Sequence, residues 1–444
     1  MPVLHIKNAR VIDPASKTDK VMDLVCKDGK ILLMGENLMY TPEYKKIPRH
    51  ELQMIDAEGL VAAPGLVDTH VHFRDPGFPD KEDIYTGAAA AAAGGYTSVV
   101  MMANTNPAAD SPETLTYMLE KGKETPVHVY ACSTVTKQMA GRELADLEAL
   151  KEVGAVGFTD DGKPILDEGL VRRGMERAAA LGMPVSFHEE DPAYIFENGI
   201  NAGPVAEKLG LKGSHRNAEI TMVERDLKLA KETGACVVIQ HISAAETVEL
   251  IRKAKAEGVN VHGEATPHHF SLTEEAVLTY GTYAKMNPPL RTEVDRTAII
   301  EGLADGTLDL IATDHAPHTK AEKEKPFAQA PSGIIGLETA LALGIKHLVK
   351  PGKLTLSQLI EKMSLNPATL YGLPAGKLEV GGPADLVLFD PRAGHVPSAF
   401  KSKAENTPFT GTHMPARVEF TICGGRVAYV RTVGFDNPYN ETNL

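Results

Sequence analysis

Two hydrophobic patterns alternate along most of the chain, and together they predict an α/β fold. From residue 60 to residue 313, short apolar runs of strand length are separated by amphipathic stretches of helical length. The predicted strands are 64–72, 97–103, 127–132, 155–159, 184–188, 236–241, 259–264 and 308–313. Examples of the predicted helices are 83–93, 141–153, 168–181, 218–233 and 244–257. Eight strand-then-helix units are what a (β/α)8 barrel of the TIM type requires, and a doubly wound open sheet is the alternative.

The two ends of the chain carry a different pattern, of short strands joined by tight turns. Asp28-Gly29 and Gly424-Gly425 each separate two short apolar runs, which predicts β-hairpins. Because chain termini commonly lie close together, we predict one small β-sandwich domain built from both ends, residues 1–60 and 380–444. The barrel, residues 61–379, would be inserted between them. Two separate β extensions are the alternative.

One local signal marks the start of a helix. Ser243-Ala-Ala-Glu246 follows the sixth predicted strand and has the spacing of a capping box. It predicts that the Ser243 side chain caps the helix 244–257.

Composition narrows the class of protein. The 444 residues are 43% hydrophobic and 24% charged, as in a soluble globular protein. No apolar run reaches the ~20 residues of a membrane helix, and a net charge of −13 argues against a nucleic-acid partner. The four cysteines are scattered, with no Cys-x-x-Cys. We therefore expect a cytoplasmic protein without membrane or nucleic-acid partners. The sequence does not decide the oligomeric state, and a homodimer is one option.

The first candidate chemistry is His70-Val71-His72, at the end of an apolar run. Side chains two apart on a strand point the same way, with Cα atoms ~6.6 Å apart. Two imidazoles so placed can hold one metal ion. Alone, His-x-His is a weak signal.

Four other predicted strands also end in a possible ligand. His188, His241 and Asp314 stand where strands five, six and eight run out, and Asp160-Asp161 ends strand four. Buried polar groups cost a few kcal/mol each unless they are satisfied, and a metal satisfies several at once. Nitrogen and oxygen ligands without thiolate suit Zn²⁺ or a similar ion. Neighbouring carboxylates on a strand point opposite ways, so at most one of the Asp pair faces the site, where it could bridge two metals.

These motifs resemble, in order and spacing over nearly the whole chain, those of the dihydroorotases, which belong to the amidohydrolase superfamily. The residues that carry the resemblance are His70-Val-His-Phe-Arg-Asp-Pro-Gly77, Asn104-Thr-Asn-Pro107, Phe158-Thr-Asp-Asp-Gly162, Asn287-Pro-Pro-Leu-Arg291 and Thr313-Asp-His-Ala-Pro-His318. The terminal segments look like the small β domain of that superfamily.

The resemblance implies a role for each residue. Two zinc ions would be held by His70, His72, Asp161, His188, His241 and Asp314, with Asp161 as the bridge. In many members of the superfamily the bridge is a carbamylated lysine, for which this chain has no counterpart. Asp314 would also be the general acid and base, with a metal-bridging hydroxide as nucleophile. The substrate would be bound by Arg74, Asn104, Asn287, His318, Ser332 and Gly333. Ser332 stands where much of the family has Phe, and Glu189 where Cys is commoner. Neither departure removes a ligand, but both alter the details of the pocket.

The activity implied is the reversible cyclisation of N-carbamoyl-L-aspartate to L-dihydroorotate in pyrimidine biosynthesis. A related cyclic amidohydrolase, such as a hydantoinase or allantoinase, is one alternative. A non-catalytic subunit that supports another pyrimidine enzyme is the other.

The remaining polar residues receive structural interpretations. We expect His268 and His269 to pack or hydrogen-bond near the site, His315 to support Asp314, and His128 and His262 to be core or inter-helix residues. Asp160 is expected to bond locally, and Asp68 to be structural. Lys320–Lys325 is interpreted as a solvated, mobile loop, and the segment 319–333 could also cover the site.

Overall fold

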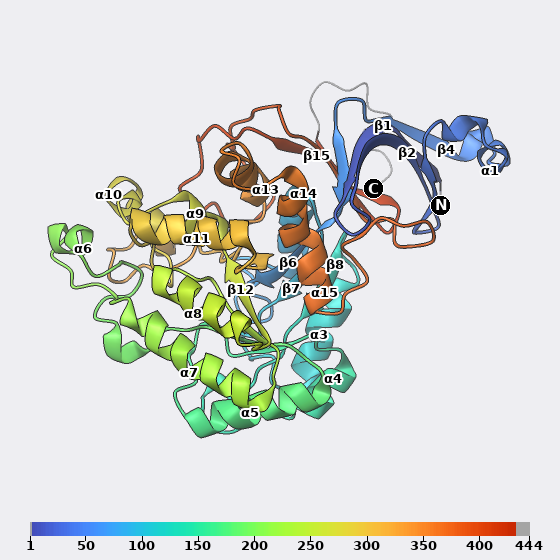
Figure 1. Cartoon of the computed structure of the whole chain (residues 1–444). Coiled ribbons are helices and arrows are strands. Elements are labelled where there is room, and N and C mark those ends of the chain that lie inside the picture. Colours follow the sequence, from blue (N-terminus) through green and yellow to red (C-terminus); the bar gives the residue numbers. More distant parts are fainter. Residues whose placement is uncertain (1, 432–444) are drawn as a thin grey trace.

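The computed structural model describes residues 2–431. Parallel strands form a barrel at its centre (Figure 1). The strands pair in chain order within two sheets. Single bridges close the ring, one between Val71 and His315 and one between Ser133 and Phe158. The strands are β6 (Leu66–Val71), β7 (Tyr96–Met101), β8 (His128–Ala131), β9 (Phe158–Thr159), β10 (Val185–Phe187), β11 (Val237–Ile239), β12 (Val261–Ala265) and β13 (Leu310–Ile311). All eight predicted strands are present, which confirms the barrel.

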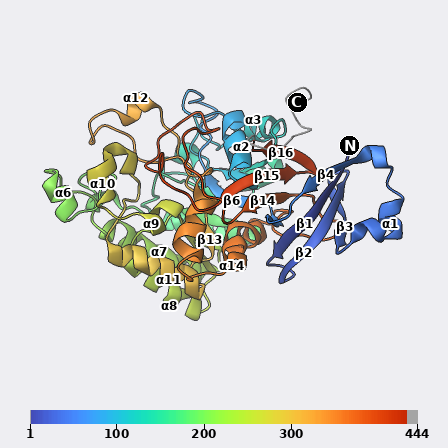
Figure 2. The same ribbon diagram turned by 90° about the horizontal axis from the view of Figure 1, so that it is seen from above.

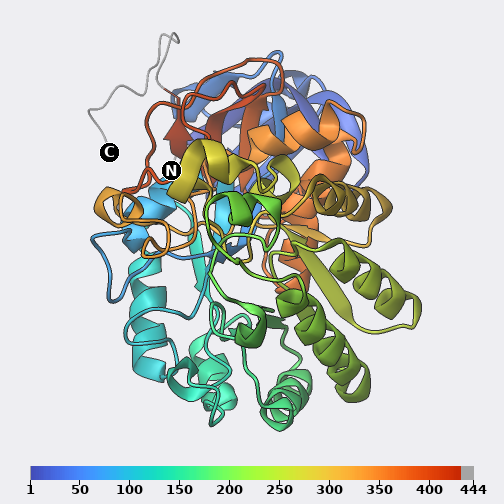
Figure 3. The ribbon, with the colours of Figure 1, turned by 90° about the vertical axis from the view of Figure 1, so that its left-hand side faces the viewer.

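Helices surround the barrel in chain order, as their succession of colours shows in Figure 3. The longer ones are α2 (Ile84–Ala93), α3 (Pro112–Gly122), α4 (Leu147–Val153), α5 (Glu168–Leu181), α7 (Asn217–Thr233), α8 (Ala245–Ala256) and α11 (Glu293–Asp305). The short ones are α6 (Pro204–Lys208), α9 (Pro267–Ser271), α10 (Ala276–Tyr280), α12 (Lys320–Lys323), α13 (Ala340–Gly344), α14 (Leu356–Ile360) and α15 (Asn366–Leu370). Helix α1 (Pro42–Lys45) lies away from the barrel, beside the N-terminal strands (Figure 1). No helix of the described residues is long and apolar enough to cross a membrane.

Two helix starts differ from the prediction. The N-cap of α8 is Ala244, without a side-chain cap, so the predicted capping box is wrong. The Ser243 hydroxyl instead donates to the buried carboxylate of Glu219. Helix α4 begins at Leu147 rather than at 141, because the Asp146 side chain accepts a hydrogen bond from Ala149 N–H and caps the helix there.

The strands from the two ends of the chain form a separate sheet at one side of the barrel (Figure 2). Its order is β16-β15-β14-β5-β1-β2-β3, with β4 paired to β1. It therefore combines both ends of the chain in one sheet, rather than two separate extensions. The strands are β1 (Val3–Asp13), β2 (Thr18–Lys27), β3 (Lys30–Gly35), β4 (Leu52–Asp56), β5 (Val61–Pro64), β14 (Leu386–Asp390), β15 (Arg417–Cys423) and β16 (Arg426–Val430).

The apolar run before His70 is divided between the two sheets. Strand β5 pairs with β1 and β14 in the terminal sheet, and β6 enters the barrel. Gly65 lies between them, where an added Cβ would come 2.1 Å from Thr97 Oγ1. The terminal sheet thus extends four residues past the predicted boundary at 60/61. The division into two domains stays a prediction, and its last part, 432–444, lies outside the described residues.

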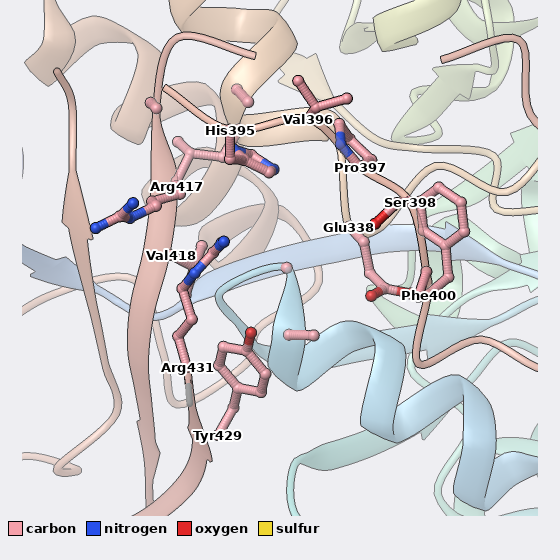
Figure 4. A pocket seen from close by; sticks show the side chains of 16 residues that line it. Glu338, His395, Val396, Pro397, Ser398, Phe400, Arg417, Val418, Tyr429 and Arg431 are labelled. Carbon is pink, nitrogen blue, oxygen red and sulfur yellow. The ribbon is translucent and has the colours of Figure 1, made fainter. Parts of the chain in front are cut away.

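The seam between barrel and terminal sheet holds its own polar groups. Asp385 accepts a hydrogen bond from Gly424 N–H at 2.7 Å, and its other oxygen lies 3.1 Å from His128 Nε2. The His128 side chain is 43% exposed, so the prediction of a core histidine is wrong. Elsewhere on the seam, a cavity of about 300 Å³ is lined by Glu338, His395 and Tyr429, among others (Figure 4).

Candidate active site

Six polar side chains meet at the carboxyl ends of five barrel strands. His70 lies on β6 and His72 directly after it, while the other four follow β9, β10, β11 and β13. All six are buried. The six predicted ligands, which are far apart in sequence, are thus brought together: His70, His72, Asp161, His188, His241 and Asp314.

Asp161 occupies the centre of this cluster. Its Oδ1 lies 3.5 Å from His70 Nε2, 3.7 Å from His188 Nδ1 and 3.6 Å from His241 Nε2. Its Oδ2 lies 3.4 Å from His72 Nε2. One carboxylate therefore faces all four imidazoles, which is the position that a bridging ligand needs.

Asp314 completes the cluster on the side of the His-x-His pair. Its Oδ1 lies 3.1 Å from His72 Nε2 and 3.6 Å from His70 Nε2. Two groups of three could each hold an ion, since their ligand atoms lie within 4.8 Å of one another. These groups are His70, Asp161 and His241, and His70, His72 and Asp314.

The residues present fit a divalent metal. His70 Nε2 and Asp161 Oδ1 are buried and have no hydrogen-bond partner among the described residues. Leaving such atoms unsatisfied costs free energy, whereas coordination would satisfy them. The donors are imidazole nitrogens and carboxylate oxygens, which suit zinc and similar ions.

Further carbonyl and carboxylate oxygens hold the outer ring nitrogens of three histidines. His70 Nδ1 lies 2.9 Å from Glu264, His188 Nε2 lies 3.0 Å from Glu190, and His72 Nδ1 lies 2.9 Å from the Asn104 amide oxygen. Such contacts orient the inner nitrogens toward the centre. Sequence reasoning missed Glu264 and Glu190. Glu264 could have been found, because it ends the seventh predicted strand as the ligands end theirs.

The charges of the cluster depend on one another. Burial opposes ionisation of Asp161, but the charge of His70 and the close contacts with the other histidines outweigh it and hold its pKa well below the usual range. Burial likewise opposes protonation of His188, yet Asp161 and Glu190 raise its pKa to about 10. The cluster thus concentrates opposite charges without solvent, as a metal centre does.

Three site residues have a left-handed backbone. The φ angle is 52° at Arg74, 32° at His241 and 49° at Asp314. Non-glycine residues rarely adopt this conformation, and it is concentrated at functional sites. Here it occurs just past the strand ends, where the chain turns the side chains toward the site.

A pocket of about 380 Å³ opens onto the cluster. Of the predicted substrate residues, five line it: Arg74, Asn104, Asn287, Ser332 and Gly333. Asn287 Oδ1 is buried there with no hydrogen-bond partner among residues 2–431. Asn198, which the sequence analysis missed, also lines the pocket and accepts a hydrogen bond from the Ser332 hydroxyl at 2.6 Å.

His318 is not among the residues that line this pocket. Its Nε2–H donates to the Ser332 carbonyl at 2.9 Å. Burial, and then the charge of Arg74, lower its pKa to about 2, so the ring is neutral. His318 therefore supports the pocket wall in this structure, and direct contact with substrate stays a prediction.

The segment after β13 differs from the predicted solvated loop. Thr319 and Glu322 form a capping box for the short helix α12. The side chain of Lys320 is 79% exposed, as expected, but Lys323 is only 1% exposed. The prediction is therefore wrong for Lys323, which is an interior residue.

The structural interpretations of the nearby polar residues mostly hold. Asp160 accepts from Val135 N–H at 2.8 Å and from Thr136, so it bonds locally. Asp68 accepts from the backbone N–H of His70 and Thr313. His315 Nε2 lies 3.3 Å from Glu82 and its Nδ1 accepts from Gly336 N–H at 3.2 Å, so its support of Asp314 stays a prediction.

Comparison with known proteins gives the family. The model of the Amidohydrolase family matches residues 61–428. Dihydroorotase from Clostridioides difficile is 54% identical over 427 residues, which cover 96% of this chain and all of that protein. Dihydroorotase from Clostridium acetobutylicum is 50% identical, with 96% and 99% covered. Among solved structures, L-hydantoinase from Arthrobacter aurescens has a TM-score of 0.82 at 26% identity, with 96% of both chains covered.

Proposed function

This chain belongs to the dihydroorotase family of the amidohydrolases, and we propose that it interconverts L-dihydroorotate and N-carbamoyl-L-aspartate through the site described above. It is a metal-dependent hydrolase of cyclic amides that serves pyrimidine biosynthesis. The observation that carries the proposal is the contact of Asp161 with all four buried histidines beside a pocket that contains Arg74.

Zinc is our proposal for the metal, with two ions per chain. The residues that would hold it are His70, His72, Asp161, His188, His241 and Asp314. When bound, the metal would polarise the reacting carbonyl and lower the pKa of a water molecule toward neutrality.

Arg74 and its neighbours would bind and orient the substrate. Dihydroorotate carries a carboxylate, and a guanidinium can form a bidentate, charge-assisted pair with it. Asn104, Asn287 and the Ser332–Gly333 backbone offer further polar groups to the ring. The local positive charge of Arg74 lets an anion bind although the chain as a whole carries −13.

Asp314 would transfer the proton. In hydrolysis it accepts a proton from the attacking water and delivers it to the ring nitrogen as the amide bond breaks. In cyclisation it would remove the proton from the same nitrogen of the carbamoyl group as this nitrogen bonds to the carboxyl carbon, and would return it to the carboxyl oxygen that leaves as hydroxide. General acid–base help of this kind is worth ~10²–10⁴-fold in rate.

The test is turnover by the purified, zinc-loaded protein, with dihydroorotate, hydantoin and allantoin compared under the same conditions. We expect hydrolysis of dihydroorotate, and the reverse reaction with carbamoyl aspartate. If hydantoin or allantoin is the better substrate, the alternative amidohydrolase is correct. If no compound reacts while metal is bound, the non-catalytic subunit is favoured. A homodimer in the cytoplasm also stays a proposal, which sedimentation and cell fractionation would test.

A further inference from the structure

One wall of the pocket is a loop without regular structure. We call residues 326–333 the pocket loop. Ala328, Ala330, Pro331, Ser332 and Gly333 of this loop line the pocket. A loop that contacts substrate must be fixed if its atoms are to bind reproducibly.

Side-chain donors hold four consecutive carbonyl groups of the pocket loop. Lys285 Nζ donates to the Ala330 carbonyl at 2.7 Å, and Lys323 Nζ donates to those of Pro331 at 2.9 Å and Gly333 at 3.0 Å. The carbonyl between them, of Ser332, accepts from His318. The backbone carbonyl of each of residues 330–333 thus accepts a hydrogen bond from a side chain outside the loop.

Lys285 holds the loop at two further points. Its Nζ also donates to the Phe327 carbonyl at 2.7 Å, and its own backbone carbonyl accepts from Gly333 N–H at 2.9 Å. Gly333 fits closely, because its φ is +113° and an added Cβ would come 2.6 Å from the Ala316 Cβ. The loop therefore has little freedom at its pocket end.

Both lysines are unusual for their burial. Lys285 is 3% exposed and Lys323 is 1% exposed. Within residues 2–431, neither forms an ion pair with a carboxylate within 4.0 Å. Lysines are rarely buried without such a partner. Their ammonium groups are satisfied by loop carbonyls instead, so burial of the lysines and the shape of the loop depend on each other.

We propose that Lys285 and Lys323 are positioning residues that hold the pocket loop in its substrate-binding shape. This rests on the proposed function, because it assigns the loop to dihydroorotate binding. The lysines act on substrate only through the loop and lie outside the set of metal ligands. Loss of either should therefore weaken binding more than it slows the chemical step.

The kinetic test uses the full-length, metal-loaded protein with Lys323→Met, Lys285→Met and the control Lys320→Met, which removes an exposed lysine from the same short helix. For the first two variants we expect KM for dihydroorotate to rise roughly tenfold, with kcat within about twofold and metal content unchanged. The control should match the wild type. A fall in kcat without a rise in KM would overturn the proposal.

The second readout is hydrogen exchange of peptides that cover 326–333. In both variants these amides should exchange roughly tenfold faster, while peptides that cover β7 should not change. Unchanged exchange in the pocket loop would show that the lysines do not hold it. This readout does not need turnover, so it distinguishes failure of the clamp from failure of the proposed function.

The third readout begins with the wild type alone, and this part does not depend on whether a variant folds. An amine-reactive acylating reagent, followed by mass spectrometry, should modify Lys320 at least roughly tenfold faster than Lys323 and Lys285. In Lys285→Met, acylation of Lys323 should become faster, because the loop that buries it is released. Equal rates at Lys320 and Lys323 in the wild type would overturn the proposal.

Discussion

Buried polar groups at two places in this molecule are satisfied in different ways. At the seam, Asp385 is paired with a backbone N–H and with His128. At the carboxyl end of the barrel, His70 Nε2 and Asp161 Oδ1 have no partner among the described residues. Asp385 is thus satisfied by protein groups alone, whereas the cluster is incomplete as a purely protein structure. The difference teaches that unsatisfied atoms of several metal-binding side chains gathered at one point, rather than buried charge or a single unsatisfied atom, mark the site that requires a ligand.

Cavity size does not separate the two places. The cavity on the seam measures about 300 Å³ and the pocket beside the cluster about 380 Å³. Glu338 lines the former (Figure 4), and its carboxylate accepts from the backbone N–H groups of Lys401 and Ser402. The latter is lined by five of the six predicted metal ligands: His72, Asp161, His188, His241 and Asp314. The chemistry of the lining residues therefore identifies the functional pocket, and the volume of the cavity does not.

Removal of the metal is the strongest test of the difference between the active-site cluster and the seam. Dialysis against a chelator should lower dihydroorotate hydrolysis by more than about 10³-fold, because the water and the carbonyl lose their activation. The apparent unfolding temperature should also fall, since an ion present at 100 times its Kd contributes about 2.7 kcal/mol. Activity and unfolding are measured before and after zinc is returned. Full activity in protein shown to be free of metal would contradict the site.

Asp314→Asn is expected to have the next largest effect. It should lower kcat by roughly 10²–10⁴-fold, because an amide cannot accept and return the proton. Metal content is measured in parallel to separate this role from ligation. The matched control is Asp385→Asn at the seam, which should lower stability by about 1–3 kcal/mol and leave kcat within about twofold. Similar losses of kcat in both variants would mean that the two places do not differ in function.

Arg74→Met should act mainly on substrate binding. Loss of a charge-assisted pair with the substrate carboxylate is worth about 1.5–3 kcal/mol, so KM should rise roughly ten- to a hundredfold. Steady-state kinetics with dihydroorotate would measure it, with hydantoin, which lacks the carboxylate, as a comparison. If KM for dihydroorotate does not change, the carboxylate is bound elsewhere.

Most of the active-site cluster could be predicted from the sequence, because the end of a strand has a local sequence signal. His188, His241 and Asp314 each follow a short apolar run, and parallel strands bring their carboxyl ends to one edge. The sequence could not predict the contacts of polar residues that do not stand at the ends of strands. Ser243 had the spacing of a cap, yet Glu219 competes for its hydroxyl. Lys323 stood in a charged run, and its burial depends on carbonyls eight and ten residues away along a folded loop.

The smallest expected effect is a pH dependence at the seam. Burial raises the pKa of Glu338 from 4.5 to about 7. A folded-state pKa above the unfolded one contributes stability below about pH 4.5 that is lost as pH rises through about 7. Because Glu338 is only partly buried, we discount the effect to about 1 kcal/mol. Glu338→Gln lacks this proton, so the stability of the wild type relative to the variant should decrease between pH 5 and pH 8. Unfolding temperatures of both proteins at the two pH values would measure this decrease. A relative stability that stays constant or increases would contradict a raised pKa of Glu338.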